Sequence, residues 1–95
     1  MNEISDSEAI GVVREFFRKP GVAAVEILRG RVKVGDQVRF TGHTTNFTQR
    51  IESMQLNHND IPEANAGDYV GILVADRVRE NDRMFLESGD MGVSI

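Results

Sequence analysis

The chain has 95 residues, of which 40% are hydrophobic and 27% are charged; its net charge is −4 and it contains no cysteine. This length allows a single domain with one core and leaves no room for a catalytic domain beside an accessory one. The composition excludes wholesale disorder, and the lack of cysteine excludes a disulfide framework and a thiolate zinc site. The acidic balance argues against a general nucleic-acid binder, and no DNA partner is expected.

The first residues are polar and acidic, and we expect residues 1–8 to form a tail that precedes one domain at residues 9–95. No basic stretch followed by an apolar stretch marks a secretory leader there. No apolar run approaches the roughly 18 residues that are needed to cross a bilayer. A cytoplasmic protein without a membrane partner is therefore expected.

Short apolar segments separated by turn signals occupy the rest of the chain, and this rhythm is typical of an all-β domain. We expect strands at residues 9–17, 22–28, 30–34, 37–41, 48–55, 69–74 and 83–86, with 91–95 as a further candidate. A loop is expected over residues 57–65. The break in alternation between Ile51 and Met54 predicts a β-bulge. The nearly all-apolar segment 69–74 predicts a strand that is buried on both faces.

A helix over residues 6–18 is the alternative for the first element. A capping-box pattern formed by Ser5 and Glu8 precedes it, and apolar residues follow at helical spacing. Gly11 and a high content of β-branched and aromatic residues disfavour a helix, so we favour a strand.

Two Gly-Asp turns, Gly35-Asp36 and Gly67-Asp68, each lead into an apolar strand. Such turns between alternating strands are typical of a small closed barrel. We therefore predict a closed antiparallel β-barrel of six or seven strands. Its predicted core consists of the inward apolar residues of these strands: Val13, Val25, Ile27, Val32, Val38, Phe40, Ile51, Met54, Val70, Ile72 and Val74.

Signatures of catalysis are absent from the sequence. It has no glycine-rich phosphate loop ending in Lys-Ser or Lys-Thr, and no Gly-x-Ser-x-Gly elbow. The two imidazoles, His43 and His58, are fifteen positions apart and lack the spacing of a metal site. We expect a protein without enzymatic activity, cofactor or metal.

Two segments are candidates for a binding surface. Residues 14–50 carry eight basic and three acidic side chains, and Arg29, Arg31 and Lys33 alternate so that an extended strand would place them on one side. Such a row suits phosphate contacts, and it equally suits protection of an exposed sheet edge against aggregation.

The segment 41–47 concentrates hydroxyl, imidazole and amide groups in His43, Thr44, Thr45 and Asn46. These donors and acceptors could hold a ligand or an RNA end. The alternative is a hydrogen-bonded turn in which the threonine side chains satisfy the backbone.

Three segments carry a resemblance to a known family: Arg29–Asp36, Ser53-Met54-Gln55 and Ala64–Ile72. At this spacing they resemble the second domain of elongation factor Tu and other translation GTPases, over about residues 10–86. The chain is more similar still to small free-standing elongation-factor-like proteins and to the barrel of collagenase-like peptidase family proteins. Asn81-Asp82 stands where the family usually has glycine, and asparagine accepts left-handed dihedral angles better than most residues.

In the GTPases this domain packs against the nucleotide domain and helps to hold the acceptor end of aminoacyl-tRNA. The nucleotide domain is missing here, so GTP hydrolysis is not implied. The resemblance implies a non-catalytic RNA- or translation-associated binding module that contacts tRNA or another RNA through the two candidate segments. The alternative is a protein-interaction module that docks an apolar patch onto a separately encoded enzyme or GTPase, such as a translation-related or RNA-modifying protein.

Overall fold

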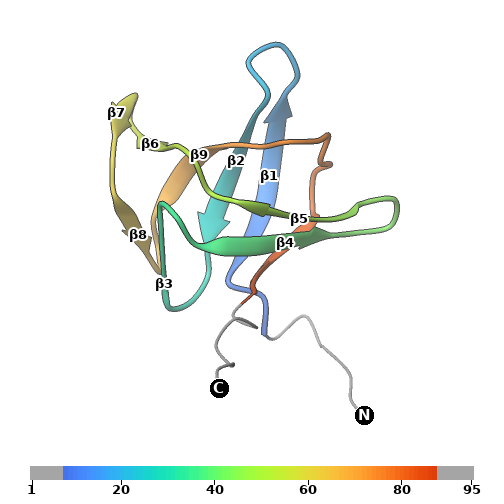
Figure 1. Cartoon of the computed structure of the whole chain (residues 1–95), viewed down its shortest axis with the longest axis horizontal. Helices are drawn as coiled ribbons and strands as arrows, with labels where there is room; N and C mark the ends of the chain where they lie inside the picture. Colours follow the sequence, from blue (N-terminus) through green and yellow to red (C-terminus); the bar gives the residue numbers. More distant parts are fainter. Residues whose placement is uncertain (1–7, 88–95) are drawn as a thin grey trace.

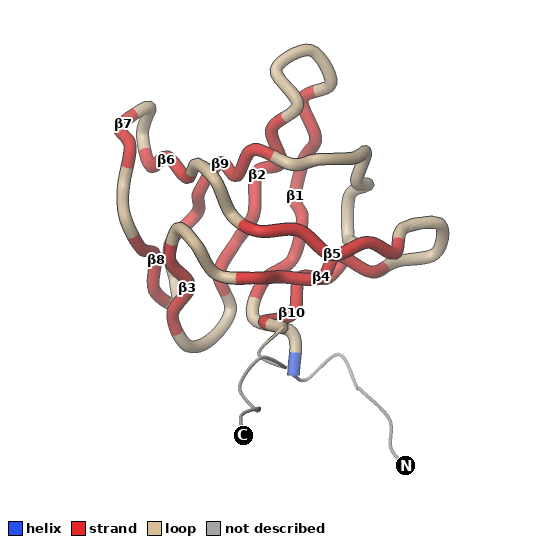
Figure 2. Tube along the Cα trace, viewed as in Figure 1, coloured by secondary structure: helices blue, strands red, loops and turns tan. Residues whose placement is uncertain are grey.

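The computed structural model describes residues 8–87, and this range is built from β-strands, with a short helical turn at Glu8 and no α-helix (Figures 1 and 2). The ten strands are β1 (Gly11–Phe17), β2 (Val22–Ile27), β3 (Arg31–Lys33), β4 (Gln37–Thr41), β5 (Asn46–Arg50), β6 (Met54–Leu56), β7 (Asn59–Asp60), β8 (Glu63–Asn65), β9 (Tyr69–Leu73) and β10 (Arg83–Leu86). The all-β prediction is confirmed. The helical alternative for residues 6–18 is wrong in the described part of that range, because β1 pairs with β2 on one side and β10 on the other.

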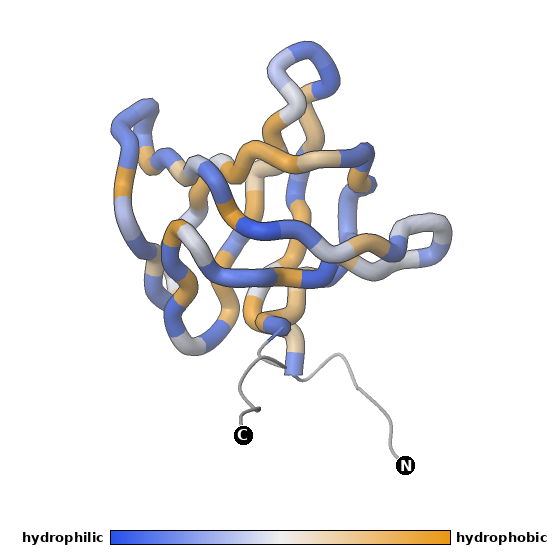
Figure 3. The backbone as a smooth tube through the Cα atoms, in the orientation of Figure 1, coloured by the Kyte–Doolittle hydropathy of each residue, from blue (hydrophilic) through white to orange (hydrophobic). Residues whose placement is uncertain are grey.

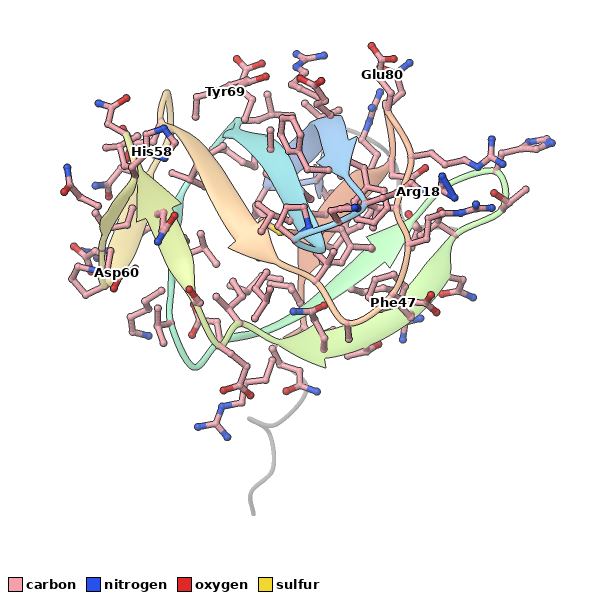
Figure 4. The ribbon with its side chains drawn as sticks, turned by 90° about the horizontal axis from the view of Figure 1, so that it is seen from above. Arg18, Phe47, His58, Asp60, Tyr69 and Glu80 are labelled. Atoms are coloured by element: carbon pink, nitrogen blue, oxygen red, sulfur yellow. The ribbon has the colours of Figure 1, made fainter. Side chains whose placement is uncertain are left out.

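Two antiparallel sheets make up the described range. The larger has the strand order β5-β4-β10-β1-β2-β9-β6-β7, and the smaller pairs β3 with β8. Figures 1 and 4 show β4 and β5 passing across β1 and β2, with side chains between the two layers. Neither ladder closes on itself within residues 8–87, so the prediction of a closed barrel of six or seven strands is wrong in closure and in strand number.

The side chain of Gln49 connects β5 to the end of β9, two strands that do not pair through their backbones. Gln49 in β5 is 9% exposed. Its Nε2 donates to the carbonyl oxygen of Leu73 at 3.0 Å, and its Oε1 accepts from the amide of Ala75 at 2.7 Å. The primary amide therefore satisfies a backbone donor and a backbone acceptor of the chain that leaves β9, as a neighbouring strand would.

The core lies between the layers and consists of inward residues of most strands. All predicted core residues are buried except Val74, which is half-buried and packs against the core. Residues that the prediction omitted also contribute to it, namely Ile10, Ala23, Ala64, Val78 and Met84. Figure 3 shows hydrophobic stretches along β1, β2 and β9 and a hydrophilic tip on the turn between β1 and β2.

Several local predictions require correction. Residues 51–53 connect β5 to β6 and form no bulge, and the register shift lies instead between Val13 and Glu15 in β1. Ile51 breaks the alternation because it enters the core from this connection while its amide donates to the carbonyl of Asp36. The segment 57–65, expected as a loop, contains β7 and β8. Residues 1–7 of the predicted tail at 1–8, and the candidate strand at 91–95, lie outside the described residues.

The strand β9 is buried on one face only, against the prediction of two. Val70 and Ile72 are buried, whereas Tyr69 is 52% and Leu73 43% exposed. The apolar run is continuous because the outward residues are also apolar, although no described segment covers them. This uncovered face contributes to one of the two cavities described below.

Three turns share one arrangement. In the two predicted Gly-Asp turns, Gly35 and Gly67 have φ of 101° and 98°, and the following aspartate accepts from the amide three residues earlier. The third turn ends in Asn81-Asp82: Asn81 has φ of 78°, and Asp82 Oδ2 accepts from the amide of Arg79 at 2.8 Å. The expectation that Asn81 accepts a left-handed conformation is confirmed.

Candidate functional site

The predicted basic row lies in and before β3. Arg31 and Lys33 are exposed on either side of buried Val32, so they share a face as predicted. Two of the three cations have partners: Arg31 Nη1 lies 3.8 Å from Glu63 and Lys33 Nζ lies 3.3 Å from Asp36. Only Arg29 of this row has no carboxylate partner within residues 8–87. The strand β3, which carries Arg31 and Lys33, pairs with β8 along one edge.

The predicted polar segment forms a tight turn between β4 and β5. The amide of Gly42 donates to the carbonyl of Thr45 at 2.8 Å, and Thr45 is buried. His43 and Thr44 are exposed at the tip. A Cβ on Gly42 would overlap the carboxylate of Asp82, so only glycine permits this approach. The turn is thus hydrogen-bonded, and it also forms one wall of a cavity.

That cavity is polar, and its volume is about 430 Å³. It lies between the β4–β5 turn and the segment that follows β9, and its walls consist of Thr44, Thr45, Asn46, Phe47, Asp76, Arg77 and Arg79. Three predicted site residues therefore meet here, while His43 is not part of the wall. Arg77 and Arg79 were not predicted as site residues, because the connection between β9 and β10 has no periodicity that would have placed them.

A second cavity is mostly apolar. Its volume is about 600 Å³, and it lies on the outer face of β1, β2 and β9 beside the β6–β7 turn. We call it the apolar groove; its walls consist of Phe17, Pro20, Val22, Ala24, Gln55, Asn57, His58, Tyr69, Val70 and Gly71. Figure 4 shows His58 and Tyr69 on the same side of the molecule.

The shape of the apolar groove depends on two backbone features. Asn57 and His58 have φ of 53° and 68°, which gives the two-residue turn of a β6–β7 hairpin and carries both polar side chains to the rim of the groove. Gly71 lies under Val22, whose Cγ1 would be 3.2 Å from an added Cβ. No role was predicted for this face, because β9 was expected to be buried on both sides.

No group of three or more His, Asp or Glu side chains within residues 8–87 is placed to hold a metal ion. None of the described segments is a helix that is long and apolar enough to cross a membrane.

Comparison with known proteins relates the chain to peptidases. It is 38% identical over 78 residues to an uncharacterized protease of Methanocaldococcus jannaschii. The match covers 81% of this chain and 19% of that protein. It is 30% identical over 77 residues to a collagenase of Porphyromonas gingivalis, covering 80% of this chain and 21% of the collagenase. The chain thus spans about a fifth of the length of these curated relatives.

Solved structures agree. The crystal structure of the C-terminal domain of a candidate U32 peptidase from Geobacillus thermoleovorans superposes with a TM-score of 0.80 at 27% identity, over 90% of this chain and 99% of that domain. Its selenomethionine variant gives a TM-score of 0.76 at 28% identity, over 82% and 98%. The model of elongation factor Tu domain 2 matches residues 21–90. Because this match covers most of the chain, the protein belongs to the elongation factor Tu domain 2 family.

Proposed function

We propose that this protein is a non-catalytic module that binds RNA, with an unpaired base lying in the apolar groove. The observation that carries the proposal is the presence of two exposed aromatic rings together with amide and imidazole groups in one hollow. Phe17 is 45% and Tyr69 52% exposed, although both are aromatic residues on a sheet. Sequence-specific RNA-binding domains commonly stack unpaired bases on such rings.

The polar groups at the rim suit the edge of a base. Gln55, Asn57 and His58 offer donors and acceptors beside an apolar floor. The volume of about 600 Å³ lies within the range of small-ligand sites. The family resemblance supports an RNA end as the ligand, since the corresponding domain of the translation GTPases helps to hold the acceptor end of aminoacyl-tRNA.

Two exposed cations that could contact the RNA backbone come just before a residue of the groove wall in the chain. Arg18 and Lys19 directly precede Pro20 in the β1–β2 turn, and both are exposed. Neither has a carboxylate partner in the part of the chain that the structure describes. The proposal therefore assigns phosphate contacts to this turn in preference to Arg31 and Lys33, which already have ion-pair partners.

Fluorescence anisotropy with a labelled single-stranded RNA tests the proposal. Stacking on an aromatic side chain is worth about 1–3 kcal/mol per base, so Tyr69→Ala should weaken binding by about 5- to 150-fold. Affinity should also fall as salt rises, because phosphate contacts release counterions. Leu86→Ala is the matched control: Leu86 is 42% exposed but lies on β10, outside the groove. Absence of RNA binding by the wild type at about 50 mM salt, where such contacts are strong, would refute the proposal.

A second candidate is a protein-docking module, and the exposed apolar face favours it. Leu73 extends the apolar surface beside Tyr69 on β9, and exposed apolar patches often mark protein interfaces. Similar domains in the relatives are parts of longer chains. Co-purification from native lysate separates the two candidates. A protein partner that survives nuclease treatment and is lost with Tyr69→Ala supports docking, and loss on nuclease treatment supports RNA.

A further inference from the structure

We propose that the polar cavity between the β4–β5 turn and the segment from Asp76 to Arg79 is a second binding site, and that it takes the phosphate group of a phosphate ester. This inference does not depend on the function of the apolar groove. It rests on the charges, the hydrogen-bond donors and the rigid walls of the cavity.

The cavity has an excess of positive charge. Arg77 and Arg79 form part of its wall and are exposed, and no carboxylate of residues 8–87 lies within 4.0 Å of either guanidinium. The one acidic residue of the wall is Asp76, whose Oδ1 already accepts from the amide of Arg77 at 2.7 Å. The wall thus contains two guanidinium groups and one carboxylate. Guanidinium groups match the geometry of phosphate oxygens and can donate two parallel hydrogen bonds.

Neutral donors complement these charges. Thr44 and Thr45 carry hydroxyl groups, and Asn46 carries an amide. Asn46 Oδ1 accepts from Arg39 Nη1 at 2.9 Å, so its NH₂ group remains to donate. Arg39 is itself fixed by Glu87, at 2.7 Å between Nε and Oε2. Hydroxyl and amide donors beside arginines are a donor set that suits an oxyanion.

Neighbouring contacts fix both walls of the cavity. On one side, Asp82 holds the amide of Arg79, and the absence of a side chain at Gly42 lets Asp82 pack against the β4–β5 turn. On the other side, the ring of Phe47 packs on Phe40 with 5.4 Å between centroids. Figure 4 shows Glu80 far from Phe47, at the other end of the segment that follows β9, and Glu80 is not part of the wall. A site on such a scaffold needs little reorganisation to bind its ligand.

The size of the cavity indicates what carries the phosphate. A volume of about 430 Å³ is typical of sites for small organic molecules. This volume is several times that of one phosphate group, so the site also has room for a sugar that carries the phosphate. A phosphomonoester and one link of an RNA backbone share this chemistry, and the experiment distinguishes them.

Titration of the full chain, isotopically labelled for NMR, tests the inference. Inorganic phosphate should shift the amide signals of Thr44–Phe47 and the guanidinium signals of Arg77 and Arg79 in a saturable way at millimolar concentrations. The double variant Arg77→Gln/Arg79→Gln should lose at least tenfold in affinity. Arg29→Gln removes an exposed and unpaired charge elsewhere, and it should leave the titration unchanged. Unsaturable shifts, or equal losses in Arg29→Gln, would overturn the proposal.

The source of the phosphate follows from two further titrations, with ribose 5-phosphate and with a short RNA. Tighter binding of ribose 5-phosphate than of RNA to these residues assigns a phosphomonoester, and the reverse assigns a phosphodiester chain. Tyr69→Ala keeps phosphate binding at this cavity while it weakens RNA binding in the apolar groove. The outcome for this site is therefore separate from the outcome for the proposed function.

Discussion

Asp36, Asp68 and Asp82 make the same contact at three places along the chain. Each accepts a hydrogen bond from the amide three residues earlier. The residue directly before each aspartate has positive φ. Glycine occupies that position twice and asparagine once. Asparagine is one of the few residues besides glycine that adopt this conformation routinely, which is why the third turn can form without glycine.

Gly67→Ala isolates the cost of this conformation. Its φ is 98°, and a Cβ there would meet no atom within 4 Å, so only backbone strain opposes the substitution. We expect the free energy of unfolding to fall by about 1–2 kcal/mol, measured by urea denaturation. Asn81→Gly is the matched control and should keep the stability of the wild type within about 0.5 kcal/mol. Equal stability of Gly67→Ala and the wild type would contradict this account of the turn.

At the scale of the strands, β5 and the end of β9 are connected through a side chain. No ladder joins them in the described part of the chain, and the side chain of Gln49 supplies hydrogen bonds to Leu73 and Ala75. The same amide fixes the start of the segment that carries Arg77. A buried polar side chain in a β-strand therefore has a structural role that its neighbours in the sequence do not reveal.

Gln49→Leu should destabilise the protein by about 1–3 kcal/mol, because it leaves the partly buried amide of Ala75 and the partly buried carbonyl of Leu73 without their partner. Urea denaturation measures this loss: the midpoint should fall while the dependence of the unfolding free energy on urea concentration stays constant. Gln55→Leu serves as the control, since Gln55 lies in β6, and its hydrogen bond to Asp60 is exposed. A loss in Gln49→Leu no larger than in Gln55→Leu would show that the hydrogen bonds of Gln49 do not stabilise the connection between β5 and β9.

At the scale of the whole molecule, the last described strand completes the centre of the fold. The strand β10 lies between β4 and β1 in the larger sheet, although it is the last strand along the described chain. It also contributes buried Met84 to the core. The two layers therefore cannot join through backbone hydrogen bonds until nearly the whole chain is present.

A chain of residues 8–87 should fold alone and unfold in one cooperative thermal transition, followed by circular dichroism. A chain of residues 8–82, which ends before β10, should show no cooperative transition, because β4 and β1 would each lose a paired neighbour. Cooperative unfolding of the shorter chain would contradict the central role assigned to β10.

Which cations have ion-pair partners also becomes clear only from the folded molecule. Within residues 8–87, ion pairs engage Arg14, Arg31, Lys33 and Arg39, and each of these pairs is at least partly exposed. Exposed pairs of this kind contribute at most about 1 kcal/mol each, so their main effect is on which cations remain available to a ligand. Arg18, Lys19, Arg77 and Arg79 lie outside these pairs, and two of them line the polar cavity.

The sequence by itself determined most of the longer strands and most of the core, but not β7 and β8. Alternation at residues 37–41 predicted β4 with its observed bounds, and inward residues such as Val25 and Ile72 are buried as predicted. Glycine followed by aspartate predicted two turns, and the motifs around them indicated the family. These features are local: side-chain period and backbone dihedral preference are fixed by residues close together in the chain.

Only the tertiary structure decided the closure of the sheet and the make-up of the cavities. Gln49 lies 24 and 26 positions from its partners, and the polar cavity joins Thr44–Phe47 to Asp76–Arg79 across a similar separation. The outward face of β9 has the same apolar character as its inward face, so its exposure depends on what the rest of the chain covers. Contacts between distant segments follow from packing of the whole chain, and no local pattern in the sequence encodes them.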